Sequence, residues 1–567
     1  MKRVSVHSIC SILFLVLLCR QTACAQINPY SYSINKKSTG VKCAVVSAHP
    51  LASKVGLMIL QKGGNAFDAA IATQLALAVV YPGAGNLGGG GFMVAHLKNG
   101  ENITLDYREK APGQGSRDMY LDANGNALTQ LSQDGPLASG VPGSVAGIFA
   151  TYKYAKLPFK KLIQPAIDLA DQGFAITEDM AADLNELRED FLARNSYPTA
   201  FVKKEPWHIG EIILQKELAA TLKRIRDKGI TGFYEGKTAE LIVATMKKGN
   251  GIISMDDLKN YSVKERKPIE FDYHGHHVIS MNLPSSGGLI LQQMLKMIED
   301  RDIGRMGFLS ASAIQLMIEV ERRAFADRGE FLGDPDFVKV PVKTLVSSTY
   351  LQERMKDFVQ GKAGSSSGTK AGNIKESEET THFSIIDEEG NAVSITTTLN
   401  DSYGSKVVVA GAGFIMNNEM DDFSIKPGVP NMYGAIGNDK NAIAPGKRML
   451  SSMTPTIVLK DNETFLVVGT PGGTTIPTSV FQTIINVIDF GMGPDSAVNQ
   501  PKFHHQWLPD SVYIERTMPA SLTAQLEAMG YKIKKRGGIG RTELIWIRQK
   551  KIIAIGDHRG DDAAEAY

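Results

Sequence analysis

The chain has 567 residues, of which 22% are charged and 43% hydrophobic, and its formal net charge is +2. This composition is typical of a globular protein with ample apolar material for a core. The balanced charge gives no electrostatic reason to expect nucleic acid or an anionic membrane surface as a partner. Length alone would suggest about three or four domains. Motifs later in the chain indicate fewer domains than this.

The first 25 residues are typical of an export signal. Lys2 and Arg3 supply positive charge, residues 9–18 form a short apolar run, and Ala23-Cys24-Ala25 gives a small-x-small cleavage pattern. We therefore expect residues 1–25 to be a signal peptide and the mature chain to begin at Gln26. The protein would be exported, either to the periplasm or into the medium.

The cysteines predict a mature chain without an intramolecular disulfide. Cys10, Cys19 and Cys24 lie in the leader, so Cys43 alone remains after cleavage and cannot form an intramolecular disulfide. A lipid anchor on Cys24 or Cys19 is less favoured, because the residues before each fit a lipoprotein signal poorly. No later segment reaches about 18 uninterrupted apolar residues, so no membrane span is expected. The apolar neighbours of Cys43 predict an inert thiol in a buried strand.

The elements that follow the leader are predicted from their apolar patterns. Asn65 is placed to cap a helix, and Asp68 lies in the first turn of that helix, where a negative charge is favoured. Gly88 to Gly91 lack the downstream Lys-Ser/Thr of a phosphate-binding loop, so we expect close packing or a tight backbone path there. Residues 159–295 mix amphipathic helices with short strands. The expected elements are a strand at 42–47, helices at 52–61 and 67–80, and a strand at 92–97.

An abrupt change of composition marks position 380. Residues 360–379 are rich in Gly and Ser and then charged, which by composition alone indicates a flexible linker or surface loop. Residues 380–387 and 392–398 then alternate around a glycine-containing turn, which predicts a β-hairpin. A flexible segment that ends at a threonine opening a core strand is where a self-processing nucleophile would lie.

Several motifs occur along the chain in a fixed order, and together they are far more specific than any one of them. They are Gly63-Gly64-Asn65-Ala66-Phe67-Asp68-Ala69-Ala70, Gly88 to Gly91, Asp106-Tyr107-Arg108-Glu109, Thr380-Thr381-His382, Thr398-Leu399-Asn400, Asn417-Asn418-Glu419-Met420-Asp421-Asp422-Phe423, Ser451-Ser452-Met453 and Pro471-Gly472-Gly473. With these motifs the sequence resembles the γ-glutamyltransferases, glutathione hydrolases of the N-terminal nucleophile superfamily, over nearly all of the mature chain.

This resemblance implies a fold and a division of the chain. The fold would be α+β, a four-layer αββα sandwich formed jointly by two autoprocessed subunits. Residues 26–379 would form the large subunit, with a flexible tail at about 360–379, and residues 380–567 the small catalytic subunit. Cleavage would fall between Glu379 and Thr380. The substrates implied are γ-glutamyl compounds such as glutathione, with water, amino acids or dipeptides as acceptors.

The chemistry of Thr380 is coherent with this division. A threonine hydroxyl needs a base to become a nucleophile. Cleavage before Thr380 would free an α-amine, which in reference peptides titrates at about 7.7–8.0 and is therefore partly neutral near physiological pH. Nucleophile and base would then share one residue. Before cleavage, the same hydroxyl could attack the Glu379 carbonyl and give an ester that water opens. Without the downstream motifs, Thr380 would be read as an ordinary strand residue.

The resemblance also implies roles for the other motif residues. Arg108 with the Ser451 and Ser452 hydroxyls would bind the α-carboxylate of a γ-glutamyl group, and the Gly472 and Gly473 amides would stabilise the oxyanion. Asp422, Glu419 and Asn400 would bind the α-ammonium, Thr398 would support the nucleophile, and Tyr433 would contact the substrate from residues 430–447, which resemble a lid. In relatives the position of Glu419 holds either Gln or Glu.

Each of these residues has a simpler structural reading when taken alone. Arg108 could be a surface arginine, residues 417–422 a solvated turn, Ser451-Ser452 the start of a strand, and Gly472-Gly473 a strand-ending turn. His504-His505 lack partners at metal-ligand spacing, so no metal site is expected. The proposed chemistry also requires no cofactor.

Three rival functions stay open on the sequence. Two are enzymes on the same scaffold, a cephalosporin acylase and a poly-γ-glutamate transpeptidase. The third, from another class, is an uncleaved and inactive binding module. Arg108 together with Asp422 favours glutamyl recognition over the first two, and the presence of Thr380, Thr398 and the two glycines argues against the third.

Overall fold

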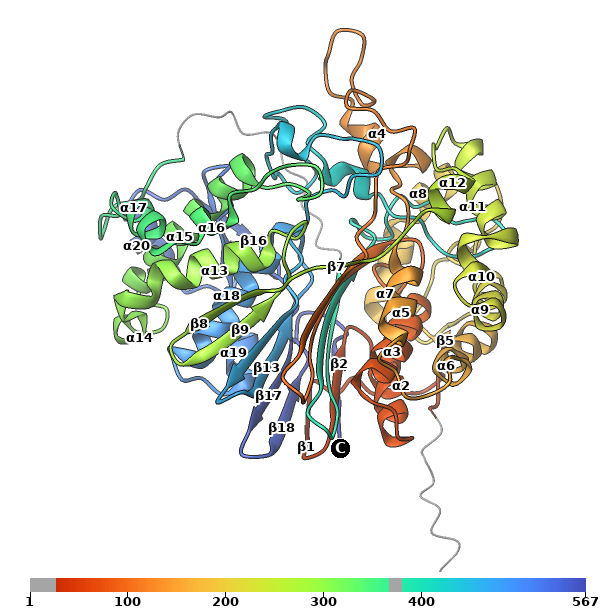
Figure 1. Ribbon diagram of the computed structural model, residues 1–567, viewed down its shortest axis with the longest axis horizontal. Helices are drawn as coiled ribbons and strands as arrows, with labels where there is room; N and C mark the ends of the chain where they lie inside the picture. Colours follow the sequence, from red (N-terminus) through yellow and green to blue (C-terminus); the bar gives the residue numbers. More distant parts are fainter. Residues whose placement is uncertain (1–26, 367–379) are drawn as a thin grey trace, which may run out of the picture.

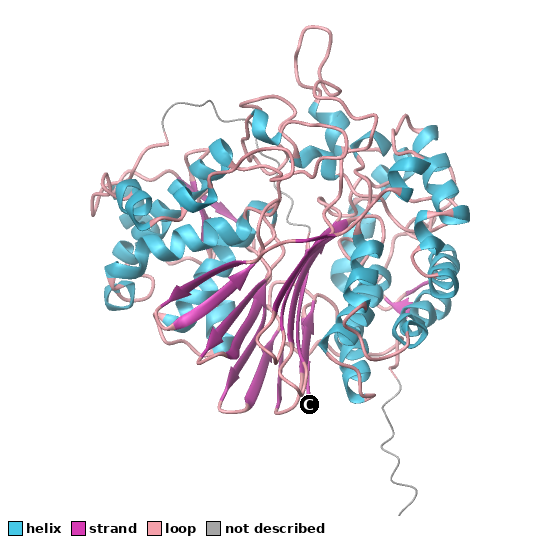
Figure 2. Cartoon of the chain, in the orientation of Figure 1, coloured by secondary structure: helices cyan, strands magenta, loops and turns pink. Residues whose placement is uncertain are grey.

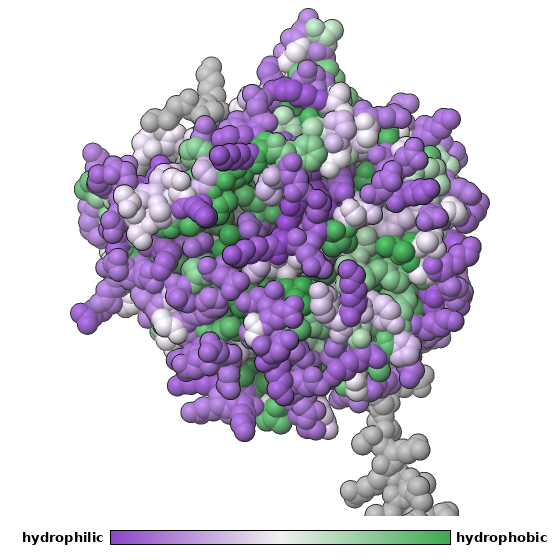
Figure 3. Space-filling model, in the orientation of Figure 1, coloured by the Kyte–Doolittle hydropathy of each residue, from purple (hydrophilic) through white to green (hydrophobic). Residues whose placement is uncertain are grey.

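The computed structural model describes residues 27–366 and 380–567. The expected signal peptide, most of the expected flexible segment and Glu379 lie outside the described residues. Two antiparallel sheets of seven strands each form the centre of the molecule, and helices cover the outer face of both (Figures 1 and 2). The face shown in Figure 3 carries mainly hydrophilic residues, with smaller hydrophobic patches between them.

Both sheets contain strands from before and after position 380. The first has the order β1 (Lys37–Gly40), β18 (Lys551–Ile555), β17 (Glu543–Arg548), β13 (Glu463–Gly469), β12 (Thr456–Lys460), β9 (His276–Ser280) and β8 (Ile269–Tyr273). The second has the order β19 (Ala563–Ala566), β2 (Ala44–Ser47), β10 (Thr381–Ile386), β11 (Ala392–Thr398), β3 (Gly90–His96), β4 (Asn102–Asp106) and β7 (Lys264–Glu265). The two parts of the chain therefore share both sheets.

Two short sheets and two helical layers complete the fold. The short sheets are β14 (Phe503–His504), β15 (Val512–Glu515) and β16 (Ile533–Arg536), and β5 (Phe174–Ala175) with β6 (Ile212–Ile213). On the side of the second sheet lie α2 (Pro50–Gln61), α3 (Ala66–Val80), α5 (Ser144–Tyr152), α6 (Phe159–Gln172), α7 (Glu178–Glu186), α8 (Arg188–Arg194), α9 (Lys216–Lys228), α10 (Thr231–Tyr234), α11 (Gly236–Lys248) and α12 (Met255–Lys259). On the side of the first lie α13 (Gly287–Ile298), α14 (Ile303–Met306), α15 (Ala311–Phe331), α16 (Val342–Leu345), α17 (Ser348–Arg354), α18 (Ile476–Ile488), α19 (Pro494–Asn499) and α20 (Ala520–Ala528). The helix α4 (Thr129–Gln133) lies beyond one end of the sheets.

Strand β10 shows how the layers are held together. Its Phe383 and Ile385 side chains belong to the core beneath the helices, whereas His382 and Ser384 alternate toward the other sheet. Ser384 donates a hydrogen bond to the Glu543 carbonyl, and the Ser394 hydroxyl on β11 donates to Val468 in the facing sheet. The two sheets are thus joined by side-chain hydrogen bonds as well as by apolar contacts.

The elements predicted at the start of the chain are present with small shifts at their ends. Helix α2 begins at Pro50, two residues earlier than expected, because the His49 side chain caps it and Pro50 occupies its first turn. Asn65 caps α3 in a reciprocal capping box with Asp68, as predicted. Cys43 is buried as predicted, one residue before β2, and burial raises the pKa of this thiol to about 11.

The glycine run before β3 has the packing role that the sequence suggested. A Cβ atom on Gly89 would lie 2.0 Å from the Thr398 carbonyl oxygen, and one on Gly91 would lie 2.4 Å from that of Thr396. Only glycine therefore allows β3 and the loop before it to approach β11 this closely. The prediction of close backbone packing is confirmed, and the run helps to hold the end of β11.

The first residues of the expected linker contact helix α15. Gly364 donates its backbone N–H to Glu319, and Gly361 donates to Gln315. The Ser366 hydroxyl accepts a hydrogen bond from buried Arg322. Within residues 27–366 and 380–567, no helix is both long enough and apolar enough to cross a membrane.

Candidate active site

A polar cavity lies where the central strands β10 and β11 reach the start of α18. Every predicted site residue within the described part of the chain lines it except Gly472, which precedes the lining residue Gly473. The lining residues are Arg108, Arg328, Thr380, Thr398, Asn400, Glu419, Asp422, Asn431, Tyr433, Ser451, Ser452, Met453, Gly473, Thr474 and Ile476. Side chains from widely separated motifs are therefore brought together at one place.

Thr380 lies at the head of a strand in the middle of the sheet. It precedes β10, which pairs with β2 on one side and β11 on the other, and its side chain is only 4% exposed. Its hydroxyl lies 3.4 Å from that of Thr398 at the end of β11, and Thr398 accepts a hydrogen bond of 2.8 Å from the Asn400 backbone N–H. The sheet thus fixes the distance between the two threonines.

The nearest histidine in the sequence is not placed to act as the base for Thr380. The ring nitrogens of His382 lie 2.9 Å from the Thr396 hydroxyl and 3.0 Å from that of Ser384. Burial lowers the pKa of His382 to about 3, so the ring is neutral at physiological pH and both nitrogens are occupied. His382 is a structural residue between the sheets.

Arg108 is surrounded by carboxylates and is only 1% exposed, so the surface-arginine reading is wrong. Its guanidinium lies 2.6 Å from Glu419, 2.5 Å from Asp422 and 3.5 Å from Glu109. Burial by itself would lower the pKa of Arg108, but these three carboxylates raise it above its usual value. Burial in turn raises the pKa of Glu419 well above its usual value, against the opposing effect of Arg108. Both charge signs thus meet inside one buried site.

Ser451 and Ser452 lie in an extended segment that ends before β12 begins at Thr456, so they do not simply start that strand. The Ser452 hydroxyl accepts a hydrogen bond of 3.2 Å from Arg328. The Ser451 carbonyl accepts hydrogen bonds from both the backbone and the hydroxyl of Ser286, at the start of α13. Both serines line the cavity.

Gly472 and Gly473 form a turn that no other residue type would easily adopt. Their φ angles are +133° and +53°, and a Cβ on Gly473 would lie 2.8 Å from the Tyr433 ring. Within the described residues, neither backbone N–H donates a hydrogen bond to the protein. The turn leads through the 3₁₀ helix η5 (Gly473–Thr475) into α18, so both amides lie at the positive end of a helix. Such amides can stabilise a developing oxyanion.

The segment that contains Tyr433 lies over the cavity and is held at several points. The Tyr433 hydroxyl donates a hydrogen bond to the Asn400 carbonyl. The backbone carbonyl of Tyr433 accepts a hydrogen bond of 2.9 Å from the Gln506 side chain. Asn431 donates to Asp422, and the Met432 backbone N–H donates to Asp421. These contacts place Tyr433 against the glycine turn. Opening and closing of residues 430–447 as a lid stays a prediction.

Sequence reasoning assigned no role to Arg328 or to Asp421, which neighbours the lining residue Asp422. Arg328 was not predicted, although it lines the cavity. Asp421 was quoted only as part of a motif, yet it is buried and accepts hydrogen bonds from Ser132 and Met432. Burial raises the pKa of Asp421 to about 7. The position of Asp421 within the acidic motif could have indicated a role, whereas nothing in the sequence distinguishes Arg328 from its charged neighbours on α15.

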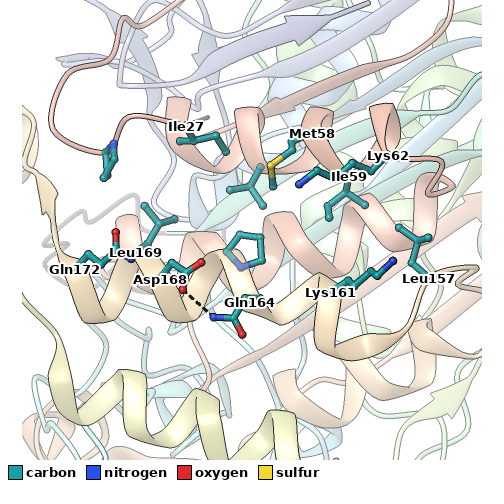
Figure 4. Close-up of a pocket in the computed structure, with 13 residues that line it drawn as sticks. Ile27, Met58, Ile59, Lys62, Leu157, Lys161, Gln164, Asp168, Leu169 and Gln172 are labelled. Carbon is teal, nitrogen blue, oxygen red and sulfur yellow. Dashed lines mark hydrogen bonds between the residues drawn. The ribbon is translucent and has the colours of Figure 1, made fainter. Parts of the chain in front are cut away.

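A larger cavity lies elsewhere, between helices α2 and α6, and has a volume of about 770 Å³ (Figure 4). Its lining is mainly apolar and includes Val55, Met58 and Leu169. The interaction drawn within it is a hydrogen bond of 2.8 Å between Gln164 and Asp168. Within residues 27–366 and 380–567, no group of three or more His, Cys, Asp or Glu side chains could hold a metal ion.

Comparisons with known proteins show the family to which the chain belongs. The family model described as Gamma-glutamyltranspeptidase matches residues 52–567. A glutathione hydrolase proenzyme of Escherichia coli (strain K12) is 45% identical over 530 residues, which cover 92% of this chain and 91% of that protein.

Two solved structures are similar in fold. The gamma-glutamyltranspeptidase of Helicobacter pylori has a TM-score of 0.56 and 44% identity, covering 61% of this chain and 97% of that one. The cephalosporin acylase from Bacillus halodurans has a TM-score of 0.82 and 26% identity, covering 96% and 99%. These matches confirm the α+β prediction of two large sheets flanked by helices, and the chain is an enzyme of the gamma-glutamyltranspeptidase family.

Proposed function

We propose that the chain is a self-processing glutathione hydrolase that carries γ-glutamyl groups on Thr380 and transfers them to water, amino acids or dipeptides. The observation that supports this most directly is the pairing of charges around Arg108. A γ-glutamyl group presents an α-carboxylate and an α-ammonium next to each other. The cavity offers a buried guanidinium and, within 2.6 Å of it, the carboxylates of Glu419 and Asp422.

Binding would exchange one set of ion pairs for another. The substrate carboxylate would bind the Arg108 guanidinium and the Ser451 and Ser452 hydroxyls. The substrate ammonium would bind Glu419, Asp422 and Asn400. Each protein charge then keeps a partner, which matters because an unpaired buried charge is costly. A donor that lacks either substrate charge would leave one protein charge uncompensated. Selectivity for γ-glutamyl compounds follows from this argument.

Self-processing would begin with attack by the Thr380 hydroxyl on the Glu379 carbonyl carbon. A C–O bond forms, the C–N bond between the two residues breaks, and the amine of Thr380 takes the hydroxyl proton. Water then opens the ester, releasing the Glu379 carboxylate and restoring the hydroxyl. The product is a large subunit of residues 26–379 and a small subunit of residues 380–567. Both would remain together because each contributes strands to both sheets.

The catalytic cycle would use the amine that processing exposes. The Thr380 amine takes the proton of its own hydroxyl as the oxygen attacks the γ-carbonyl, with the Thr398 hydroxyl 3.4 Å away to orient it. The Gly472 and Gly473 backbone amides would donate hydrogen bonds to the oxyanion of the tetrahedral intermediate and so stabilise it. The amine then gives its proton to the leaving amine. The resulting γ-glutamyl ester passes to water or to an acceptor amine.

The rival functions make different demands on this site. An acylase for glutaryl amides, or a transpeptidase acting within poly-γ-glutamate, would share Thr380 and the oxyanion-binding turn. A glutaryl group carries no ammonium, however, and Glu419 and Asp422 would then face no cation of the substrate. Comparing hydrolysis of glutathione with that of glutaryl amides separates the acylase. An inactive module would show neither processing nor turnover.

Intact-mass analysis of wild type and Thr380→Ala is the deciding experiment. We expect two chains and γ-glutamyl hydrolysis from the wild type, and one uncut, inactive chain from the variant. N-terminal sequencing should find a second start at Thr380. A cleaved and active Thr380→Ala protein would disprove the mechanism. The same spectra report whether residues 1–25 are removed, as we propose for an exported protein of the periplasm or the medium.

A further inference from the structure

Arg328 brings a second arginine into the cavity that contains Arg108. It lies near the end of α15, its side chain is 7% exposed, and it lines the cavity together with Thr380, Asp422 and Ser452. The surroundings of the two arginines differ. Three carboxylates lie within 3.5 Å of Arg108. Among the residues that the structure describes, none forms an ion pair with Arg328.

The hydrogen-bond partners of Arg328 are two neutral hydroxyls. Its Nη2 lies 3.2 Å from the Ser452 Oγ, and its Nε lies 3.1 Å from the Ser286 Oγ. Burial lowers the pKa of Arg328 to about 10, with a smaller raising effect from Asp422 and a lowering one from Arg108. The group therefore remains a cation at physiological pH. A buried cation without a counter-charge favours binding of an anion beside it.

The direction of these hydrogen bonds determines what the serines can do. A guanidinium only donates, so the hydroxyl oxygens of Ser452 and Ser286 must accept from Arg328. Ser286 in turn donates its proton to the Ser451 carbonyl at 2.7 Å. The proton of Ser452 remains available for an acceptor in the cavity. One side chain thereby fixes both members of the Ser451-Ser452 pair and leaves a hydroxyl donor directed at a ligand.

We propose that Arg328 is a positioning residue for the α-carboxylate of the γ-glutamyl donor. It orients the Ser452 hydroxyl toward that carboxylate and adds a positive charge that no described protein carboxylate neutralises by direct contact. Arg108 makes the direct ion pair, and Arg328 acts through Ser452 and through the field in the cavity. This inference rests on the proposed γ-glutamyl specificity and extends it to a residue on a different helix.

The test uses the processed enzyme and three p-nitroanilides that differ in one charge each. The γ-glutamyl compound carries both the carboxylate and the ammonium, the glutaryl compound only the carboxylate, and the 4-aminobutyryl compound only the ammonium. Each is assayed as a donor or, where turnover is slow, as a competitive inhibitor. In Arg328→Met we expect the KM or Ki to rise about 10- to 100-fold for the first two, the range for losing a charge-assisted hydrogen bond. The third should change less than about threefold.

Arg328→Lys is the matched second variant. It keeps the positive charge but loses the paired hydrogen bonds from one guanidinium to the Ser286 and Ser452 hydroxyls. We expect an intermediate rise in KM with the same order among the three compounds, and a smaller change in kcat than in KM. Intact mass should show both subunits in each variant. If Arg328→Met is not processed, the Lys variant alone decides the question.

The outcomes separate this inference from the proposed function. A processed variant with unchanged KM for the γ-glutamyl compound would overturn the role of Arg328 while leaving the function intact. An equal loss with all three compounds would also overturn it, because it would show general damage to the site. A wild-type enzyme that fails to process or to hydrolyse the γ-glutamyl compound would instead reject the proposed function before any Arg328 variant is made.

Discussion

The candidate catalytic cavity and the cavity between α2 and α6 (the groove) differ in lining and in size, and the smaller of the two holds the predicted functional residues. The groove encloses about 770 Å³ and is lined mainly by apolar side chains, whereas the catalytic cavity has about 20 Å³ of free space. The small cavity gathers nearly every predicted functional residue, and the large one contains none of them. Cavity volume is therefore a poor guide to chemistry in this molecule.

The difference has a physical cause. In the catalytic cavity, Arg108 draws Glu419 and Asp422 to within 2.6 Å, and Tyr433 covers the site from residues 430–447. Groups of opposite charge therefore occupy much of the room in this cavity. The groove has no such convergence of charges, so nothing contracts it. Sharper tests of this contrast should therefore change charge in one region and apolar volume in the other.

Asp422→Ala should give the largest effect among these tests. It removes one partner of buried Arg108 and one predicted partner of the substrate ammonium. Truncating one member of a buried charge pair at a binding site costs about 3–4 kcal/mol, so we expect kcat/KM for γ-glutamyl p-nitroanilide to fall about 100- to 1000-fold. Steady-state kinetics on processed protein measures this.

Asp439→Ala is the matched control, because Asp439 is an exposed aspartate on the segment that covers the site, where it pairs with Arg117. We expect its kcat/KM to stay within about twofold of wild type. An Asp422→Ala enzyme that keeps wild-type kinetics would show that the charge pairing at Arg108 has no part in donor recognition.

Glu419→Gln should have a moderate effect that depends on pH. Gln keeps an oxygen acceptor for the substrate ammonium, so at alkaline pH we expect KM to rise about fivefold or less. In the wild type, the pKa of Glu419 is raised by burial, so this carboxyl becomes protonated as the pH falls and loses its attraction for the ammonium. KM of the wild type should therefore rise on acidification more steeply than that of the Gln variant. Parallel KM–pH curves for the two enzymes would contradict this assignment.

The position of Thr380 at the start of a central strand could be predicted because the signal there was local. The change from Gly- and Ser-rich residues to a β-hairpin marks Thr380, and Asn65 with Asp68 marks the start of α3. The packing role of the glycine run could also be predicted, because glycines are often required where two backbone segments approach closely. These features depend on neighbours in the chain.

Arg328 and the pairing of Arg108 could not be predicted in the same way. Charged residues at positions 319, 321–323, 327 and 328 of α15 are all buried, although such a composition ordinarily indicates a solvated helix face. Their burial depends on partners brought in by the fold, such as Ser452 for Arg328. Likewise, Arg108 meets Glu419 and Asp422 only because β4 ends beside the 3₁₀ helix η3 (Glu419–Asp422). Contacts of this kind are set by tertiary structure.

The smallest effect on catalysis is expected from the groove. Met58 on α2 is half-buried and lines it (Figure 4). Met58→Ala should lower the free energy of unfolding by about 1 kcal/mol, through loss of part of a buried side chain. Processing and kcat/KM should stay within about twofold of wild type, as judged by thermal denaturation and steady-state kinetics. A tenfold loss of kcat/KM in fully processed protein would mean that the groove is coupled to the catalytic cavity. The two regions would then no longer be independent.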